Sequence, residues 1–220
     1  MNDTTTFEFS PLVQGYWRLG DWGMSRKELL EFIQAHVDLG ITTVDHAAVY
    51  GAYTCEAIFG EALALDPALR DQLQIVTKFG IHIPSERFAD CRLPHYDTDS
   101  ETIVASVEES LRALGNDHVD LLLLHRPDPL MDAGEVAAAF DALHDAGKVL
   151  NFGVSNFTPR QFDLLQSAVN QPLITNQVEI NPLNDAVLWD GTLDQAQQLG
   201  LRPMAWSCLA GGRLFDANDE

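Results

Sequence analysis

The stretch Leu121-Leu122-Leu123-Leu124-His125 decides how this 220-residue sequence is interpreted. Its four apolar residues form a run of strand length, which is typical of a strand buried on both faces. Six other runs of similar length are spread along the chain, and helical patterns separate them. Strands that alternate with helices indicate a parallel α/β fold.

The apolar runs predict strands at residues 12–19, 42–46, 74–79, 120–125, 150–155, 175–180 and 202–209. Capping signals predict where helices begin, at Ser25 with Glu28, Thr98 with Glu101, Asp132 with Glu135, Thr158 with Pro159, and Asp190 or Thr192. One connection, residues 80–99, is long and shows no periodicity. Long loops of this kind are often functional, and this one follows a predicted strand.

Three polar residues close predicted strands: Asp45, Lys78 and His125. Tyr50 lies in the loop that follows the first of them. In a parallel barrel the carboxyl ends of all strands lie on one face, where catalytic groups gather. We therefore expect a carboxylate, an ammonium, an imidazole and a phenol to meet in one pocket and to form a proton-donating site.

Seven strands are one fewer than a closed (β/α)8 TIM barrel requires. Residues 216–220 at the end of the sequence are polar and indicate a loop instead of a closing helix. The sequence therefore predicts an α/β fold of the TIM-barrel type whose eighth strand and last helix are missing from this chain. Residues 1–220 show no linker or repeat, which predicts a single, C-terminally incomplete domain.

Composition excludes several classes of function. The net charge of −20 argues against nucleic acid and anionic membranes as partners, since both need clustered Lys and Arg. Cys55, Cys91 and Cys208 form no Cys-x-x-Cys pair, so neither a disulfide framework nor a zinc site is predicted. Residues 1–10 lack the pattern of a signal peptide, and no apolar run has transmembrane length. We expect a cytoplasmic protein without a bound metal.

Four segments resemble the aldo-keto reductases in order and spacing: residues 45–51 (DHAAVYG), 75–78 (IVTK), 123–128 (LLHRPD) and 153–157 (GVSNF). Residues 15–18 and 125–132 resemble a bacterial oxidoreductase branch of this family most. The resemblance covers essentially the whole chain. It implies a (β/α)8 barrel and the reduction of an aldehyde or ketone by NADPH.

The resemblance also implies roles for the four strand-end residues. Tyr50 would donate the proton to the carbonyl oxygen, and Lys78 would lower the pKa of its phenol, which is ordinarily about 10. Asp45 would hold Lys78 charged and oriented. His125 would hydrogen-bond the substrate oxygen and polarise the carbonyl.

Other positions match the family's cofactor site. By resemblance, Ser155, Asn156 and Gln177 would bind the nicotinamide amide, Trp206 would stack on its ring, and Trp17 would lie close to the cofactor. Ser207, Leu209, Gly211 and Arg213 resemble the loop around the pyrophosphate. The residues that hold the adenosine 2′-phosphate in the family are absent from this chain, which leaves the preference for NADPH over NADH open.

The sequence thus predicts a monomeric reductase that acts on a small-molecule carbonyl substrate. Two alternatives remain open at this point. A regulatory subunit on the same fold would bind the cofactor and turn over slowly. An inactive fragment without the last barrel unit would expose part of its core.

Overall fold

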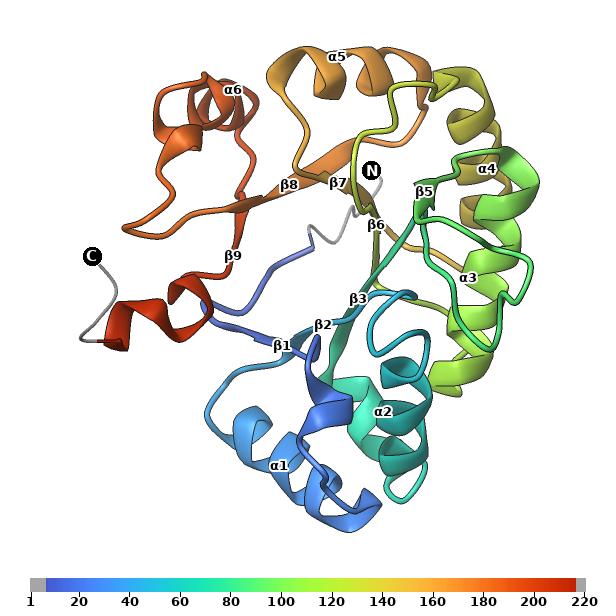
Figure 1. The fold of residues 1–220 in the computed structure, drawn as a ribbon, viewed down its shortest axis with the longest axis vertical. Helices are drawn as coiled ribbons and strands as arrows, with labels where there is room; N and C mark the ends of the chain where they lie inside the picture. Colours follow the sequence, from blue (N-terminus) through green and yellow to red (C-terminus); the bar gives the residue numbers. More distant parts are fainter. Residues whose placement is uncertain (1–6, 217–220) are drawn as a thin grey trace, which may run out of the picture.

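Seven parallel strands form one curled sheet in the computed structural model, which describes residues 7–216. Their order is β1 (Val13–Gly15), β2 (Thr43–Asp45), β3 (Gln74–Phe79), β6 (Leu121–Leu124), β7 (Phe152–Ser155), β8 (Leu173–Glu179) and β9 (Met204–Trp206). The spatial order follows the sequence, and Figure 1 shows the helices outside the sheet. All seven predicted strands are confirmed, although β1 and β9 are shorter than expected.

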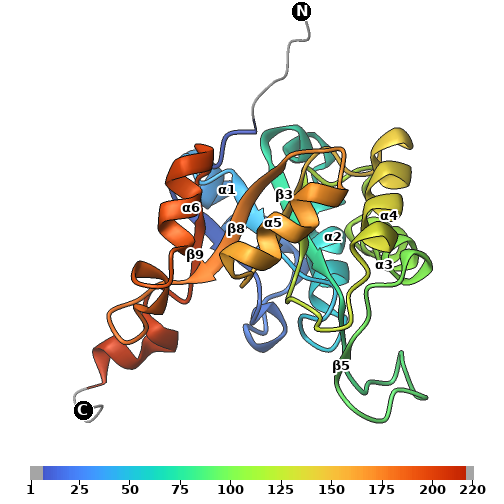
Figure 2. The ribbon, with the colours of Figure 1, turned by 90° about the horizontal axis from the view of Figure 1, so that it is seen from above.

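The sheet has the form of a (β/α)8 barrel that lacks one unit. Every neighbouring pair of its strands is parallel, and β1 and β9 are the two edges. Figure 2 shows that the loop bearing β5 and the segment after β9 project from the same end of the sheet. That end carries the carboxyl termini of the strands. The fold class predicted from the sequence is confirmed.

Within the described part of the chain, six helices cover the outside of the sheet: α1 (Arg26–Asp38), α2 (Cys55–Leu63), α3 (Ser100–Leu114), α4 (Ala133–Asp145), α5 (Pro159–Ala168) and α6 (Thr192–Leu199). Short 3-10 helices lie at Leu19–Asp21, Pro67–Gln72, Ala186–Leu188 and Ala210–Phe215. Within residues 7–216, none of the helices is long and apolar enough to cross a membrane. Residues 1–6 and 217–220, including most of the predicted C-terminal loop, lie outside the described residues.

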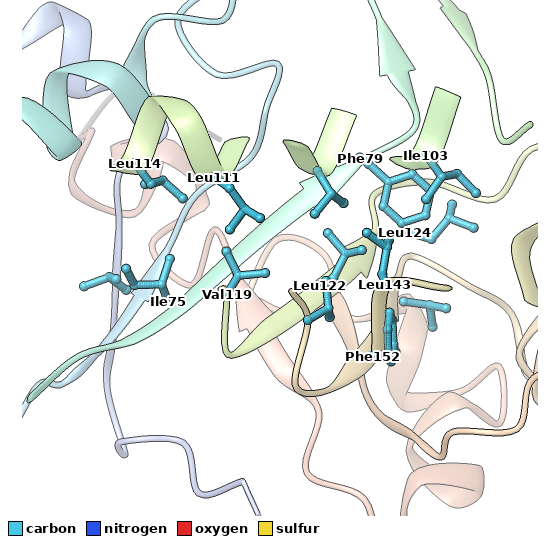
Figure 3. Close-up of a cluster of buried hydrophobic side chains, with 14 of the residues drawn as sticks. Ile75, Phe79, Ile103, Leu111, Leu114, Val119, Leu122, Leu124, Leu143 and Phe152 are labelled. Carbon is cyan, nitrogen blue, oxygen red and sulfur yellow. The ribbon is translucent and has the colours of Figure 1, made fainter. Parts of the chain in front are cut away.

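The main core lies between the sheet and the helices. Strand residues alternate between the two faces, so Leu122 and Leu124 point outward from β6 toward the helices. There they pack with Phe79 of β3 and Ile103 of α3, as Figure 3 shows. Burying a leucine side chain fully stabilises the fold by about 1.5–3 kcal/mol. This layer therefore holds the helices on the sheet.

A second, smaller apolar cluster fills the inside of the barrel. Leu121 and Leu123 of β6 point inward and contact Val76 of β3 and Met204 of β9. Phe7 and Phe9 pack against this cluster. Because side chains alternate along β3, Lys78 points inward like Val76, which carries its ammonium into the barrel at the carboxyl end of the strand.

Two of the predicted helix starts form complete capping boxes. The Ser25 hydroxyl accepts the Glu28 N–H before α1, and Thr158 and Gln161 form the same box before α5. Asp132 caps α4 as predicted, but the Glu135 carboxylate instead accepts the N–H of Ser100.

The predicted cap at Thr98 is wrong. The N-cap of α3 is Asp99, which makes no side-chain capping bond, and the Thr98 hydroxyl donates to Asp128 instead. Gly191 precedes α6, and Asp190 accepts the Thr192 N–H. The N-cap thus lies between the two predicted positions, and the helix itself begins at Thr192, which is one of them.

One helix and one hairpin of the structure have no counterpart in the sequence-based prediction. Helix α2 begins after Thr54, which makes no capping bond, so its start carries no local signal. The 80–99 connection contains a short antiparallel hairpin of β4 (Ile81–His82) and β5 (His95–Tyr96). This hairpin stands at the same end of the barrel as Lys78.

Candidate active site

A buried ion pair forms the centre of the site. The Lys78 ammonium donates to both carboxylate oxygens of Asp45, each at 2.7 Å, and to the carbonyl oxygen of His46 at 2.7 Å. Lys78 is 1% exposed. Burial alone would lower the pKa of Lys78, but Asp45 and Tyr50 outweigh it and hold that pKa above its ordinary value of 10.5. The ammonium is therefore charged and fixed in direction.

Tyr50 supplies the fourth oxygen atom that Lys78 contacts. The ammonium donates to its phenol oxygen at 3.1 Å. Burial raises the pKa of Tyr50, and the charge of Lys78 works in the opposite direction without overcoming it. Lys78 thus acts on the pKa of Tyr50 in the expected sense, and burial outweighs it. The phenol keeps its proton at neutral pH.

His125 lies beside the phenol. The rings of Tyr50 and His125 meet edge to face with their centres 5.8 Å apart. Burial, followed by the charges of Lys78 and Arg126, holds the pKa of His125 well below 6.5. A neutral imidazole carries one N–H to donate. Its Nδ1 is buried and, within residues 7–216, makes no hydrogen bond.

Arg126 is a site residue that sequence reasoning left without a role. Its positive charge lowers the pKa values of both Tyr50 and His125, and its guanidinium lies 5.5 Å from the centre of the Trp206 ring. The available signal was its position directly after His125, at the end of β6. Arg126 adds a second cation to the carboxyl end of the barrel.

A second chain of hydrogen bonds joins the residues predicted to bind nicotinamide. The Trp206 indole donates to Asn156 at 3.0 Å, the Asn156 amide donates to the Ser155 hydroxyl at 2.7 Å, and that hydroxyl donates to the carbonyl of Gln177 at 3.0 Å. The Gln177 amide then donates to Asp45 at 3.0 Å. The amide side chains, the indole and the ion pair thus form one connected polar network.

The other predicted cofactor residues lie on loops around this network. Trp17 is 59% exposed in the loop after β1, with the Arg18 guanidinium 5.1 Å from its ring centre. Leu209, Gly211 and Arg213 lie in the segment after β9 and are exposed, while Ser207 is half-buried and accepts a hydrogen bond from Asn181. The backbone of Gly211 has φ +68°, and the space where a side chain would begin is 3.8 Å from the Arg18 guanidinium.

A cavity of about 220 Å³ adjoins the network. Its lining includes Arg126, Asn156, Trp206, Glu179, Asp190 and Thr192. Glu179 accepts hydrogen bonds from the amides of Asn181 and Asn184. The cavity sits at the carboxyl ends of β6–β9 and has both polar and apolar residues in its lining.

Comparisons with known proteins find similar oxidoreductases and a similar fold. A protein of Escherichia coli named oxidoreductase YdhF is 60% identical over 213 residues, which are 97% of this chain and 70% of that protein. A 6-dehydroglucose reductase of Agrobacterium fabrum is 50% identical over 209 residues, or 94% of this chain and 70% of the relative. A solved thermostable aldo-keto reductase, in complex with the inhibitor epalrestat, superposes with a TM-score of 0.79 at 27% identity, covering 95% of this chain and 72% of its own.

The model of the aldo/keto reductase family matches residues 11–220. The matched segment contains every strand of the sheet, the Lys78–Asp45 pair and the Tyr50 turn. With oxidoreductases as its relatives and their barrel as its fold, the chain belongs to the aldo/keto reductase family.

Proposed function

We propose that this protein reduces an aldehyde or ketone to an alcohol, with hydride from NADPH and a proton from the phenol of Tyr50. The observation that carries the proposal is the contact between the Tyr50 oxygen and the Lys78 ammonium at 3.1 Å. Lys78 is itself held by both oxygens of Asp45. A phenol in that place holds its proton, and when it gives the proton up it leaves a phenolate next to a fixed positive charge.

The proton transfer follows from these positions. Burial keeps the pKa of Tyr50 high, so the acid is present in its protonated form. When the proton leaves, the phenolate gains the attraction of Lys78, which costs no reorganisation because the ammonium is already oriented. The neutral His125 donates an N–H to the same carbonyl oxygen and draws electron density from the carbon. Asp45 keeps the ammonium in place throughout.

The chemical types of the residues at the barrel mouth suit a nicotinamide dinucleotide. A flat indole suits an aromatic ring, and the amides of Asn156 and Gln177 with the Ser155 hydroxyl suit a carboxamide, which both donates and accepts. Arg18 beside Gly211, together with Arg213, places cations next to an exposed glycine loop, as a pyrophosphate requires. NADPH, when bound, supplies the hydride.

The test compares the wild-type protein with Tyr50→Phe. Loss of a positioned general acid lowers turnover by about 10²–10⁴-fold. NADPH oxidation is followed with 6-dehydroglucose as a first substrate, since a relative with 50% identity is named for it. Cofactor affinity is measured by quenching of tryptophan fluorescence, with NADH alongside, and is expected to be unchanged. Near-normal turnover by Tyr50→Phe would rule out the phenol as the proton donor.

A further inference from the structure

The turn that carries Tyr50 has an unusual backbone. Gly51, Ala52 and Tyr53 follow one another with φ values of +58°, +51° and +72°. The carbonyl oxygen of Tyr50 accepts the N–H groups of Tyr53, Thr54 and Cys55 at 3.1–3.3 Å. Residues other than glycine rarely adopt positive φ, and such strain persists only where the surroundings hold it. The turn therefore needs an anchor.

The side chain of Tyr53 supplies that anchor. Its hydroxyl accepts the N–H of Ile83 at 3.0 Å and lies 3.5 Å from the carbonyl oxygen of Ile81. Both groups belong to the backbone around β4. The hydroxyl thus joins the turn of Tyr50 to the first strand of the hairpin that follows Lys78.

Contacts of the Tyr53 ring link the turn further to the hairpin loop. The Tyr53 ring meets Phe88 edge to face with centres 4.8 Å apart, and the Arg87 guanidinium lies 5.6 Å from the Tyr53 ring centre. Arg87 also pairs with Glu109 on α3. The turn, the hairpin loop and helix α3 are therefore linked through one side chain that the proposed chemistry does not use.

We propose that Tyr53 is a positioning residue, which fixes the Tyr50 phenol beside Lys78 by tying the left-handed turn to β4. The inference rests on the proposed function for its effect on catalysis. Without the Tyr53 hydroxyl, the β4 backbone loses its bond to the turn. The Thr54 hydroxyl, which donates to the Gly51 carbonyl at 2.7 Å, remains to hold the turn together but does not attach it to the hairpin.

Tyr53→Phe tests the inference because it removes the hydroxyl and keeps the ring. Tyr16→Phe is the matched control: Tyr16 is fully buried in the core, and its hydroxyl bonds to His36 of helix α1, outside the turn. Each variant loses one phenol hydroxyl with one strong hydrogen bond. Any general effect of that loss on stability therefore appears in both.

Two readouts separate positioning from stability. The kcat of Tyr53→Phe is expected to fall by about 10-fold with KM for NADPH unchanged, since a misplacement of 1 Å can cost up to about 10²-fold. Independently of activity, labelling the ring Cζ of the four tyrosines with carbon-13 lets the Tyr50 resonance be assigned through Tyr50→Phe. That resonance and its titration are expected to shift in Tyr53→Phe and to stay in place in Tyr16→Phe.

An unchanged Tyr50 resonance in Tyr53→Phe would overturn the inference, whatever the activity. A shifted resonance with wild-type kcat would also overturn it, because the phenol would then move without consequence for the reaction. If the wild-type protein oxidised no NADPH with any carbonyl substrate, the proposed function would fail. The resonance would then still decide whether Tyr53 places Tyr50.

Discussion

Replacing Asp45 by asparagine removes the negative partner of a lysine that cannot reach water. Lys78 is 1% exposed, and Asp45 supplies two of its four oxygen contacts, both at 2.7 Å. The His46 carbonyl and the Tyr50 phenol remain in the variant, and the asparagine oxygen can still accept one hydrogen bond. The charge that balanced the ammonium is gone.

Breaking a buried ion pair by removing one partner typically costs about 3–5 kcal/mol, because the remaining charge is left uncompensated. We expect Asp45→Asn to lower the free energy of unfolding by about 3 kcal/mol, the lower end of that range, since three oxygen acceptors still surround the ammonium. The loss is large for a domain with a total stability of about 5–15 kcal/mol.

The loss depends on pH, and its sign follows from the pKa of Lys78. In the wild-type protein that pKa lies above 10.5, so the native lysine stays charged up to high pH and its stabilising effect is lost only as pH rises through the raised value. Without Asp45, burial dominates and the native pKa falls below the unfolded one. The unfolded variant then binds more protons than the native variant, so its stability rises with pH. The difference in free energy of unfolding between the wild type and Asp45→Asn therefore becomes smaller toward alkaline pH.

Urea denaturation at several pH values between about 6 and 9.5 measures this gap. Asp120→Asn is the matched control, because Asp120 pairs with Arg70 at 2.9 Å with both side chains about 15% exposed. An arginine stays protonated at every pH used, so the gap for Asp120→Asn stays constant. A loss below about 1 kcal/mol for Asp45→Asn, or a gap that does not narrow, would refute the electrostatic account of Lys78.

Two further predictions concern packing and the imidazole. Gly60→Ala places a Cβ 2.3 Å from the carbonyl oxygen of Ala113 on α3, so it should lower the free energy of unfolding by at least about 1–3 kcal/mol in urea denaturation. Gly15→Ala meets no atom of residues 7–216 within 4 Å and should be neutral; equal losses in the two variants would contradict the close approach of α2 and α3. His125 should keep the nitrogen-15 ring shifts of a neutral imidazole from about pH 8 to about pH 5.5, and a titration near its ordinary value would contradict the lowered pKa.

The sequence predicts the sheet well because the strand signal is local. A run such as Leu121–Leu124 is apolar on both faces, and both faces are in fact buried, one against helices and one in the barrel. Helix starts are predicted where the cap is also local, as at Ser25 and Thr158. The prediction fails at α3, where Glu135 from the neighbouring helix reaches Ser100 across 35 residues. No pattern within one segment carries that contact.

The residues of the candidate site also fall into those that the sequence predicts and those that it does not. Strand-end positions bring Asp45 and Lys78 together, as expected of parallel strands with side chains that alternate between faces. The roles of Arg126 and Tyr53 depend on distances between loops and on a backbone with positive φ at Ala52 and Tyr53. Both alanine and tyrosine ordinarily avoid that conformation, so residue type alone points away from it.

The opposite effects of burial and charge on Tyr50 are consistent with an acid that must hold its proton before it gives it away. If an exposed lysine lowered the pKa of the phenol to near neutral pH, the phenol would be partly ionised. Part of the acid form would then be lost. Here burial raises the pKa of Tyr50 and the Lys78 charge opposes it from 3.1 Å. The same buried ammonium then stabilises the phenolate more strongly than it would in water, because the interaction is less screened. On this reasoning, the depth of the Lys78–Asp45 pair matters for the proposed reaction as much as the identity of the two residues.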